Sequence, residues 1–195
     1  MNAAEGVMRT DDLAGWLGRY GALFWRFQRW GYRFDKLGMP GQVGSALTRR
    51  GGISVRDGSA EYEVFVEGEH FGLARANDDD AGMPLSFSRV DDAERYLAVR
   101  IGDRLRRHAG FAPRGPEWSE LGLNEGVEAF PNGDRVLLVR KADPGAHCTV
   151  PIGDRDWFSR AMMVDVEELD DLLTEGIPNM RVMRPFWAFD PIDPS

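Results

Sequence analysis

Three histidines and one cysteine are the residues of this chain best suited to catalysis near neutral pH: His70, His108, His147 and Cys148. A nucleophilic cysteine needs a base within hydrogen-bonding distance. His147 directly precedes Cys148, but adjacent side chains of a strand point to opposite faces, so the two do not form such a pair. We therefore expect Cys148 to be a buried structural residue and His108 to complement the negative end of a helix.

The acidic run Asp78, Asp79 and Asp80 raises the question of a metal ion. Three consecutive acids cannot converge on one ion without a particular loop, and the spacing of an EF-hand is absent. We expect a solvated acidic loop, with an electrostatic contact to a basic partner as the alternative. The motifs HExxH, GxSxG, GxGxxG and the P-loop are also absent. The sequence thus gives no reason to propose an enzyme, a cofactor or a bound metal.

The composition bounds the class of protein further. With 195 residues the chain is long enough for one domain with a sizeable core, and a single cysteine excludes an intrachain disulfide. The chain has 32 acidic against 24 basic residues, which disfavours nucleic-acid binding, because phosphate contacts require a basic field. No apolar run approaches a membrane span, and the N-terminus does not resemble a signal peptide, so we expect a cytoplasmic protein. All but two of the basic residues are arginines, which indicates a GC-rich bacterial genome.

The segment 11–36 combines many aromatic residues with arginines. Six apolar residues recur at helical spacing, which predicts one continuous apolar face: Trp16, Tyr20, Leu23, Phe27, Trp30 and Phe34. Four arginines flank that face, where their stems can cover apolar surface while their charged ends stay in water: Arg19, Arg26, Arg29 and Arg33. The glycines of the segment disfavour an isolated helix, so the helix needs docking to be stable.

Two aromatic residues of this helix, Trp25 and Tyr32, fall outside the apolar face. We expect the helix to cover a core while its arginines pair with acids elsewhere. A partner-binding helix and a membrane-surface helix are the alternatives. Since exposed aromatic residues are typical interface anchors, Trp25 and Tyr32 are candidate partner-binding residues, together with Asp78, Asp79 and Asp80.

The remaining elements are predicted from periodicity and turn residues. A hairpin spans 60–76 with a turn at Glu67-Gly68, and a second hairpin turns at Asn132-Gly133. A helix follows within 88–110, with Ala93, Leu97, Ile101 and Leu105 on one face and Gly110 as its stop. Short strands are expected at 53–55, 84–88, 147–152 and 160–164, loops at 38–52 and 112–124, and a last helix capped by Asp165.

This order of elements predicts an α+β protein, an antiparallel sheet packed with about three helices in a single domain. The expected organisation is a flexible N-terminus at 1–10, one domain at 11–184 that includes the helix 11–36, and a C-terminal tail at 185–195.

Four stretches between about 60 and 175 carry a resemblance to a known family: EYEVFVEGEHFGLARAND, PLSFSRVDDAERYLAVRIGDRLR, EGVEAFPNGDRVLLVRK and VDVEELDDLL. In the order of these elements and a D-x-E-R-Y-L helix start, the chain resembles actinobacterial immunity proteins of polymorphic toxin systems. The nearest are the immunity factors of mycobacterial necrotizing NAD-glycohydrolase toxins. The segment 11–36 lies outside this resemblance.

The resemblance implies a cytoplasmic antitoxin that binds a cognate toxin domain, occludes its active site and performs no chemistry. The toxin would be encoded by the adjacent gene, and neither nucleic acid nor a membrane would be a partner. The acidic composition is compatible, because an acidic surface attracts a basic partner. A secretion chaperone or adaptor, and an enzyme with a nonstandard site, are the other hypotheses.

Overall fold

The computed structural model describes residues 10–39, 43–48, 51–58, 60–76 and 84–178. Within these ranges the strands are β1 (Val43–Leu47), β2 (Ile53–Asp57), β3 (Ala60–Glu67), β4 (His70–Ala76), β5 (Leu85–Phe87), β6 (Val127–Asn132), β7 (Arg135–Arg140) and β8 (Asp143–Pro151). The α-helices are α1 (Thr10–Lys36), α2 (Val90–His108), α3 (Arg114–Glu120), α4 (Arg155–Ala161) and α5 (Val166–Thr174). A short 3-10 turn, Ile152–Asp154, precedes α4.

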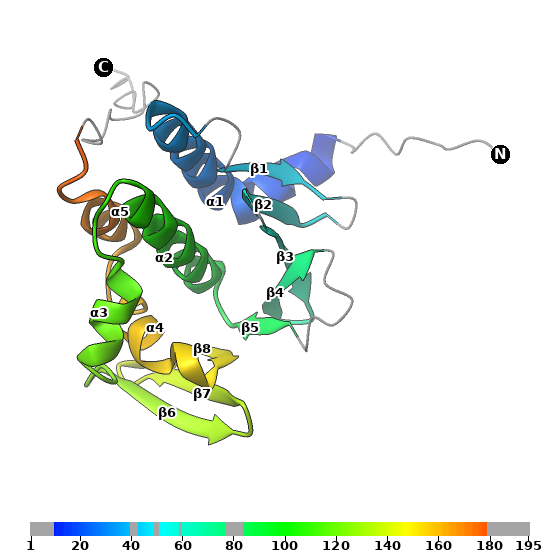
Figure 1. Ribbon diagram of the computed structural model, residues 1–195. Helices are drawn as coiled ribbons and strands as arrows, with labels where there is room; N and C mark the ends of the chain where they lie inside the picture. The colour runs from blue at the N-terminus through cyan, green and yellow to red at the C-terminus, as the bar shows by residue number, and fades with distance from the viewer. Residues whose placement is uncertain (1–9, 40–42, 49–50, 59, 77–83, 179–195) are drawn as a thin grey trace, which may run out of the picture.

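All eight described strands join one antiparallel sheet in the order β1-β2-β3-β4-β5-β8-β7-β6. Alternation along the strands gives this sheet one buried face. Val64 lies opposite Ile53 and Leu73, and all three side chains are buried. Its neighbour Glu63 points to the other face, where it is only half-buried. Figure 1 shows α2 in the middle of the molecule, with α1 and β1 at one end of the sheet and the β6–β7 hairpin at the other.

Helix α1 covers the outer edge of the sheet. Gln28 Nε2 donates to the backbone oxygen of Ser45 at 2.9 Å, and Ser45 Oγ donates to the backbone oxygen of Phe24 at 2.9 Å. A Cβ atom added at Gly31 would lie 2.6 Å from the backbone oxygen of Val43, so only glycine permits this close approach. An uncovered edge strand invites pairing with other chains, and α1 protects β1 from it.

The predicted apolar faces of the two long helices are confirmed within the described residues. On α1 five of the six predicted residues are buried: Tyr20, Leu23, Phe27, Trp30 and Phe34. The side chain of the sixth, Trp16, lies outside the described part of the chain. On α2 all four predicted residues have no exposed surface: Ala93, Leu97, Ile101 and Leu105. Asp165 also caps α5 as predicted, because its side chain accepts from the backbone N–H of Glu167.

The prediction of about three helices is wrong, because the described residues form five α-helices. Helix α3 lies in the predicted loop 112–124, and α4 extends into the segment 160–164, where the predicted strand is absent and a turn follows the helix. Each has only seven residues, too few for a clear apolar period or for stability outside its tertiary setting. Strand β1 was also missed, within the predicted loop 38–52. The class is thus α+β with a single antiparallel sheet and more helices than the sequence indicated.

The domain boundaries stay predictions. Most of the N-terminal segment 1–10 and all of the tail 185–195 lie outside the described residues.

Candidate partner-binding surface and an arginine-lined cavity

Of the residues considered for catalysis, His108 lies at the end of α2, as predicted, and the other three lie on the sheet. Cys148 is 1% exposed on the buried face, where its sulfur lies 3.7 Å from Met162 Sδ. Burial raises the pKa of the Cys148 thiol well above its ordinary value. His147 points to the opposite face, and its ring lies 5.4 Å from that of His70, which the sequence did not predict. His147 and Cys148 are therefore separated by the sheet, as the strand geometry predicted.

Acidic residues do not gather into a metal site in the described part of the chain, which contains no group of three or more His, Cys, Asp or Glu that could hold an ion. The predicted contact residues Asp78, Asp79 and Asp80 lie outside the described residues. None of the described helices is long and apolar enough to cross a membrane.

The candidate contact residues Trp25 and Tyr32 are both exposed, with 48% and 53% of their surface accessible. They lie seven residues apart on α1, which places them two turns apart on one side of the helix. The Trp25 ring meets the edge of Phe24 at 5.2 Å between centroids, and the Lys36 ammonium lies 4.9 Å from the Tyr32 centroid. These contacts hold two large aromatic side chains at the surface of a helix whose other side packs on the protein.

The buried side of α1 is anchored by an ion network around Arg26. The Arg26 guanidinium pairs with Glu94 on α2 and with Asp170 on α5, the latter at 2.8 Å, and donates to the backbone oxygen of Val166 at 2.9 Å. Trp30 Nε1 donates to the other oxygen of Asp170 at 2.9 Å. The network ties three helices together through charges that are almost fully removed from water.

The expectation that the arginines of α1 keep their charged ends in water is wrong for two of them. Arg26 is 3% exposed and Arg33 is 8% exposed. Desolvation alone would lower the pKa of Arg26, but Asp170, Glu94 and Glu167 raise it above its ordinary value. Arg33 lies 3.7 Å from Asp170 and stacks over the Trp30 ring at 4.8 Å. The other expectation, that arginines of this helix pair with acids elsewhere, is confirmed.

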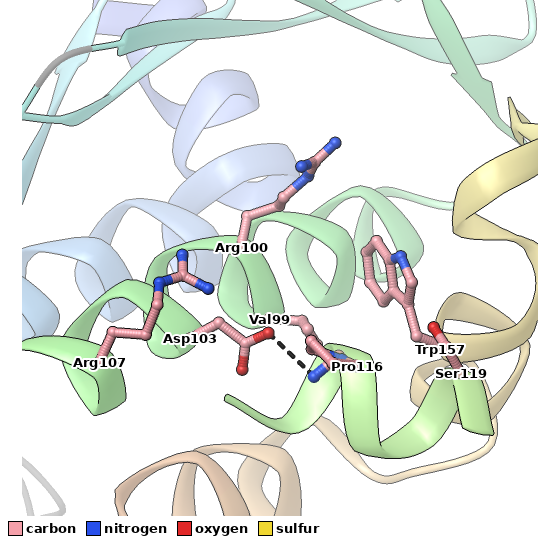
Figure 2. A pocket seen from close by; sticks show the side chains of 8 residues that line it. Val99, Arg100, Asp103, Arg107, Pro116, Ser119 and Trp157 are labelled. Carbon is pink, nitrogen blue, oxygen red and sulfur yellow. Dashed lines mark hydrogen bonds between the residues drawn. The ribbon is translucent and has the colours of Figure 1, made fainter. Parts of the chain in front are cut away.

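A cavity of about 240 Å³ lies between α2, α3 and α4. Figure 2 shows Arg100, Asp103 and Arg107 projecting from one side of α2, with Ser119 and Trp157 on the helices opposite. Three apolar or backbone positions complete the lining: Val99, Gly115 and Pro116. The spacing of residues 100, 103 and 107 is the one signal in the sequence that could have revealed this cavity, because such residues share a helix face.

Asp103 builds the cavity by fixing α3 against α2. Its two carboxylate oxygens accept the backbone N–H groups of Arg114 at 2.6 Å and Gly115 at 2.9 Å. Burial raises the pKa of Asp103, while these hydrogen bonds and the charge of Arg107 act in the opposite direction. A Cβ atom at Gly115 would meet Asp103 at 2.7 Å, so glycine is needed at this contact.

The two arginines of the cavity differ in their partners. Arg100 Nη2 lies 3.0 Å from the Tyr96 hydroxyl and 3.3 Å from Asp154 Oδ2. Trp157 Nε1 donates to Asp154 Oδ1 at 2.9 Å, which fixes the indole as a wall of the cavity. The side chain of Arg107 is exposed and forms no hydrogen bond or salt bridge within the described residues.

Comparisons with known proteins place this α+β chain among the immunity proteins. Residues 41–175 match immunity protein 61, a match that covers more than half of the chain. The chain therefore belongs to the immunity protein 61 family. Its fold is similar to that of Rv3902c from M. tuberculosis, with a TM-score of 0.57 and 14% sequence identity over 89% of this chain and 93% of that chain. No curated protein matches the chain significantly.

Proposed function

We propose that this chain is the antitoxin of a polymorphic toxin system, which binds a cognate toxin and occludes its active site without chemistry of its own. The match to an immunity protein family over residues 41–175 is the observation that carries the proposal. The toxin we propose is a NAD-glycohydrolase encoded by the adjacent gene of an actinobacterium, with the complex forming in the cytoplasm. Neither nucleic acid nor a membrane takes part.

The contact surface we propose includes the outer side of α1, with Trp25 and Tyr32. Interface hot spots are enriched in tryptophan and tyrosine, which bury a large area on binding. Both residues are about half exposed, whereas the inner side of the helix is fixed by the Arg26 network. A rigid helix that presents aromatic side chains loses little conformational entropy when it binds.

The aspartate run 78–80 is the second proposed contact. The net charge of -8 favours association with a basic toxin, and three adjacent carboxylates would add to that attraction. Replacing Asp78, Asp79 and Asp80 with Asn should slow association and flatten its dependence on salt. Unchanged association kinetics would remove this run from the contact surface.

The decisive experiment is co-expression of the chain with the product of the adjacent upstream gene. Calorimetry should show a one-to-one complex, and NAD hydrolysis by the toxin should fall to background at equal concentrations. Binding without inhibition would indicate a chaperone or adaptor. Absence of binding would contradict the proposed pairing with this gene product.

Within that complex, Trp25→Ala and Tyr32→Ala should each raise the Kd by about 30-fold or more, as expected for a hot spot. Phe130→Ala is the matched control, because Phe130 is also 50% exposed but lies on β6, at the opposite end of the sheet from α1. If all three substitutions raised the Kd equally, the loss of affinity would not depend on the position of the aromatic residue. That result would contradict a contact surface on α1.

A further inference from the structure

We propose that the cavity between α2, α3 and α4 is a binding site for a phosphate or carboxylate group carried on a small ring. Its lining holds two guanidinium groups, those of Arg100 and Arg107, and one carboxylate, that of Asp103. Arg100 forms a salt bridge with Asp154 beside the lining, so Arg107 is the lining cation that has no salt-bridge partner within the described residues. An exposed guanidinium without a salt bridge at the wall of a cavity does not follow from the proposed function and needs its own explanation.

The carboxylate of Asp103 already accepts hydrogen bonds from the protein backbone. Each of its oxygens accepts a backbone N–H from the start of α3, so its position is fixed by the fold. Arg107 has no salt bridge within the described residues and can therefore turn its donors toward a ligand. Guanidinium groups bind phosphate and carboxylate oxygens through paired N–H donors, which makes Arg107 the principal anion-binding residue of the site.

Arg100 supports the same chemistry from the other end of the cavity. The side chain of Arg100 is 47% exposed, and that of its salt-bridge partner Asp154 is 15% exposed. Asp154 thus anchors the guanidinium in place while donors remain accessible to solvent. The Ser119 hydroxyl lies in the same lining and can donate one further hydrogen bond to an anion.

Size and polarity define the rest of the ligand. Val99, Pro116 and the Trp157 indole give the cavity an apolar side next to its charged side. A cavity of roughly 150 Å³ is enough for a benzene molecule. The volume of about 240 Å³ therefore accommodates one ring with an attached anionic group. A phenyl phosphate or a benzoate has this shape, whereas a dinucleotide is too large to be enclosed.

The test is a titration of the full chain with phenyl phosphate at low ionic strength, followed by NMR. Amide signals of Gly115 and Ser119 and the indole N–H of Trp157 should shift together and saturate, with a Kd of about 1 mM or lower. Phenol, which lacks the charge, should bind at least about tenfold more weakly. The absence of saturable shifts at these positions up to about 20 mM phenyl phosphate would overturn the proposal.

Three variants separate the site from general electrostatics. Arg107→Gln should weaken phenyl phosphate binding by at least about tenfold. Arg56→Gln removes the same charge from an exposed position on β2 and should leave the Kd within about twofold. Ser119→Phe keeps every charge but fills the cavity, and should abolish the shifts. Equal losses from Arg107→Gln and Arg56→Gln would show nonspecific attraction and refute the site.

The source of the natural anion is decided by the same variant in the toxin complex. If Arg107→Gln also weakens toxin binding and phenyl phosphate competes with the toxin, an acidic side chain of the toxin is the ligand. If toxin binding is unchanged while phenyl phosphate binding is lost, the ligand is a free small molecule. The phenyl phosphate titration itself needs no toxin, so its failure is distinguishable from failure of the antitoxin proposal.

Discussion

Arginines are buried in ion pairs in one region of this protein and exposed to solvent in another. On α1, Arg26 and Arg33 are buried and lie among carboxylates supplied by α2 and α5. On α2, Arg100 and Arg107 stay exposed and line a cavity, where Arg100 has a salt bridge to Asp154 and Arg107 has none within the described residues. All four are basic residues on the flank of an amphipathic helix. What separates them is burial, because helices that carry acids pack over the first pair, whereas the second pair faces solvent and keeps donors available to a ligand.

The largest expected effect follows from breaking the buried network on α1. Arg26→Met leaves Glu94 and Asp170 without their main partner, and removal of one member of a buried ion pair costs about 3–5 kcal/mol. Urea unfolding should therefore show a loss of stability of about that size. The double variant Arg26→Met with Glu94→Leu should recover much of it, because the orphaned charge is then removed as well.

Arg29→Gln is the matched control for this experiment. The Arg29 side chain is 26% exposed and lies 4.0 Å from Asp170, so its loss should cost less than about 1 kcal/mol. A loss for Arg26→Met no larger than that for Arg29→Gln would mean that burial does not strengthen the ion pairs of Arg26.

The docking of α1 on β1 gives the second largest effect. Gly31→Ala should destabilise the protein by about 1–3 kcal/mol, because the new methyl group would lie 2.6 Å from the backbone oxygen of Val43. Gly21 lies in the same helix, but a Cβ atom added there would meet no neighbouring atom within 4 Å. Gly21→Ala should therefore stabilise the protein by about 0.5–1 kcal/mol through helix propensity. Thermal unfolding of both variants measures the difference. A stabilising Gly31→Ala would show that α1 does not approach the sheet so closely.

A smaller effect is expected at the start of α5, the helix that brings Asp170 to α1. Asp165→Ala removes the cap and should lower the Tm slightly at pH 7, whereas Asp165→Asn keeps an acceptor and should lower it less. The hydrogen bond from Glu167 lowers the pKa of Asp165 below its ordinary value of 3.8. A lowered pKa stabilises the fold at higher pH, and this contribution is lost as the pH falls through the folded-state pKa. The Tm values of wild type and Asp165→Ala should therefore converge in acid, and a constant gap would contradict the charge contribution.

The smallest expected effect on stability belongs to the cavity. Arg107→Gln should change the free energy of unfolding by less than about 0.5 kcal/mol, since the side chain is exposed and forms no salt bridge within the described residues. Urea unfolding beside Arg26→Met checks this contrast directly. A loss comparable to that of Arg26→Met would make Arg107 a structural residue like those of α1 and would remove the distinction between the two regions.

Much of the fold could be predicted where a local pattern is strong. The apolar faces of α1 and α2, the turns at Gly68 and Gly133 and the cap at Asp165 each depend on residues close in sequence. Helix α3 could not be predicted in this way, because Asp103 of α2 accepts the first N–H groups of this seven-residue helix. Strand β1 likewise depends on Gln28 of α1 for part of its outer edge. Short elements of this kind are stabilised by contacts from distant segments.

For the candidate sites, too, local patterns could be predicted from the sequence and contacts between distant segments could not. The sequence was sufficient to indicate that Trp25 and Tyr32 lie outside the apolar face of their helix, since periodicity alone fixes which side of a helix a residue occupies. It could not show that Arg26 is buried, because its partner Glu94 lies 68 residues away. Nor could it show that Arg100 and Arg107 line a cavity, since the opposite wall comes from Ser119 and Trp157. Helix spacing therefore determined the faces of the helices. Only the tertiary structure decided which charges are buried in ion pairs and which stay exposed to solvent, because the partners of the buried charges come from other helices.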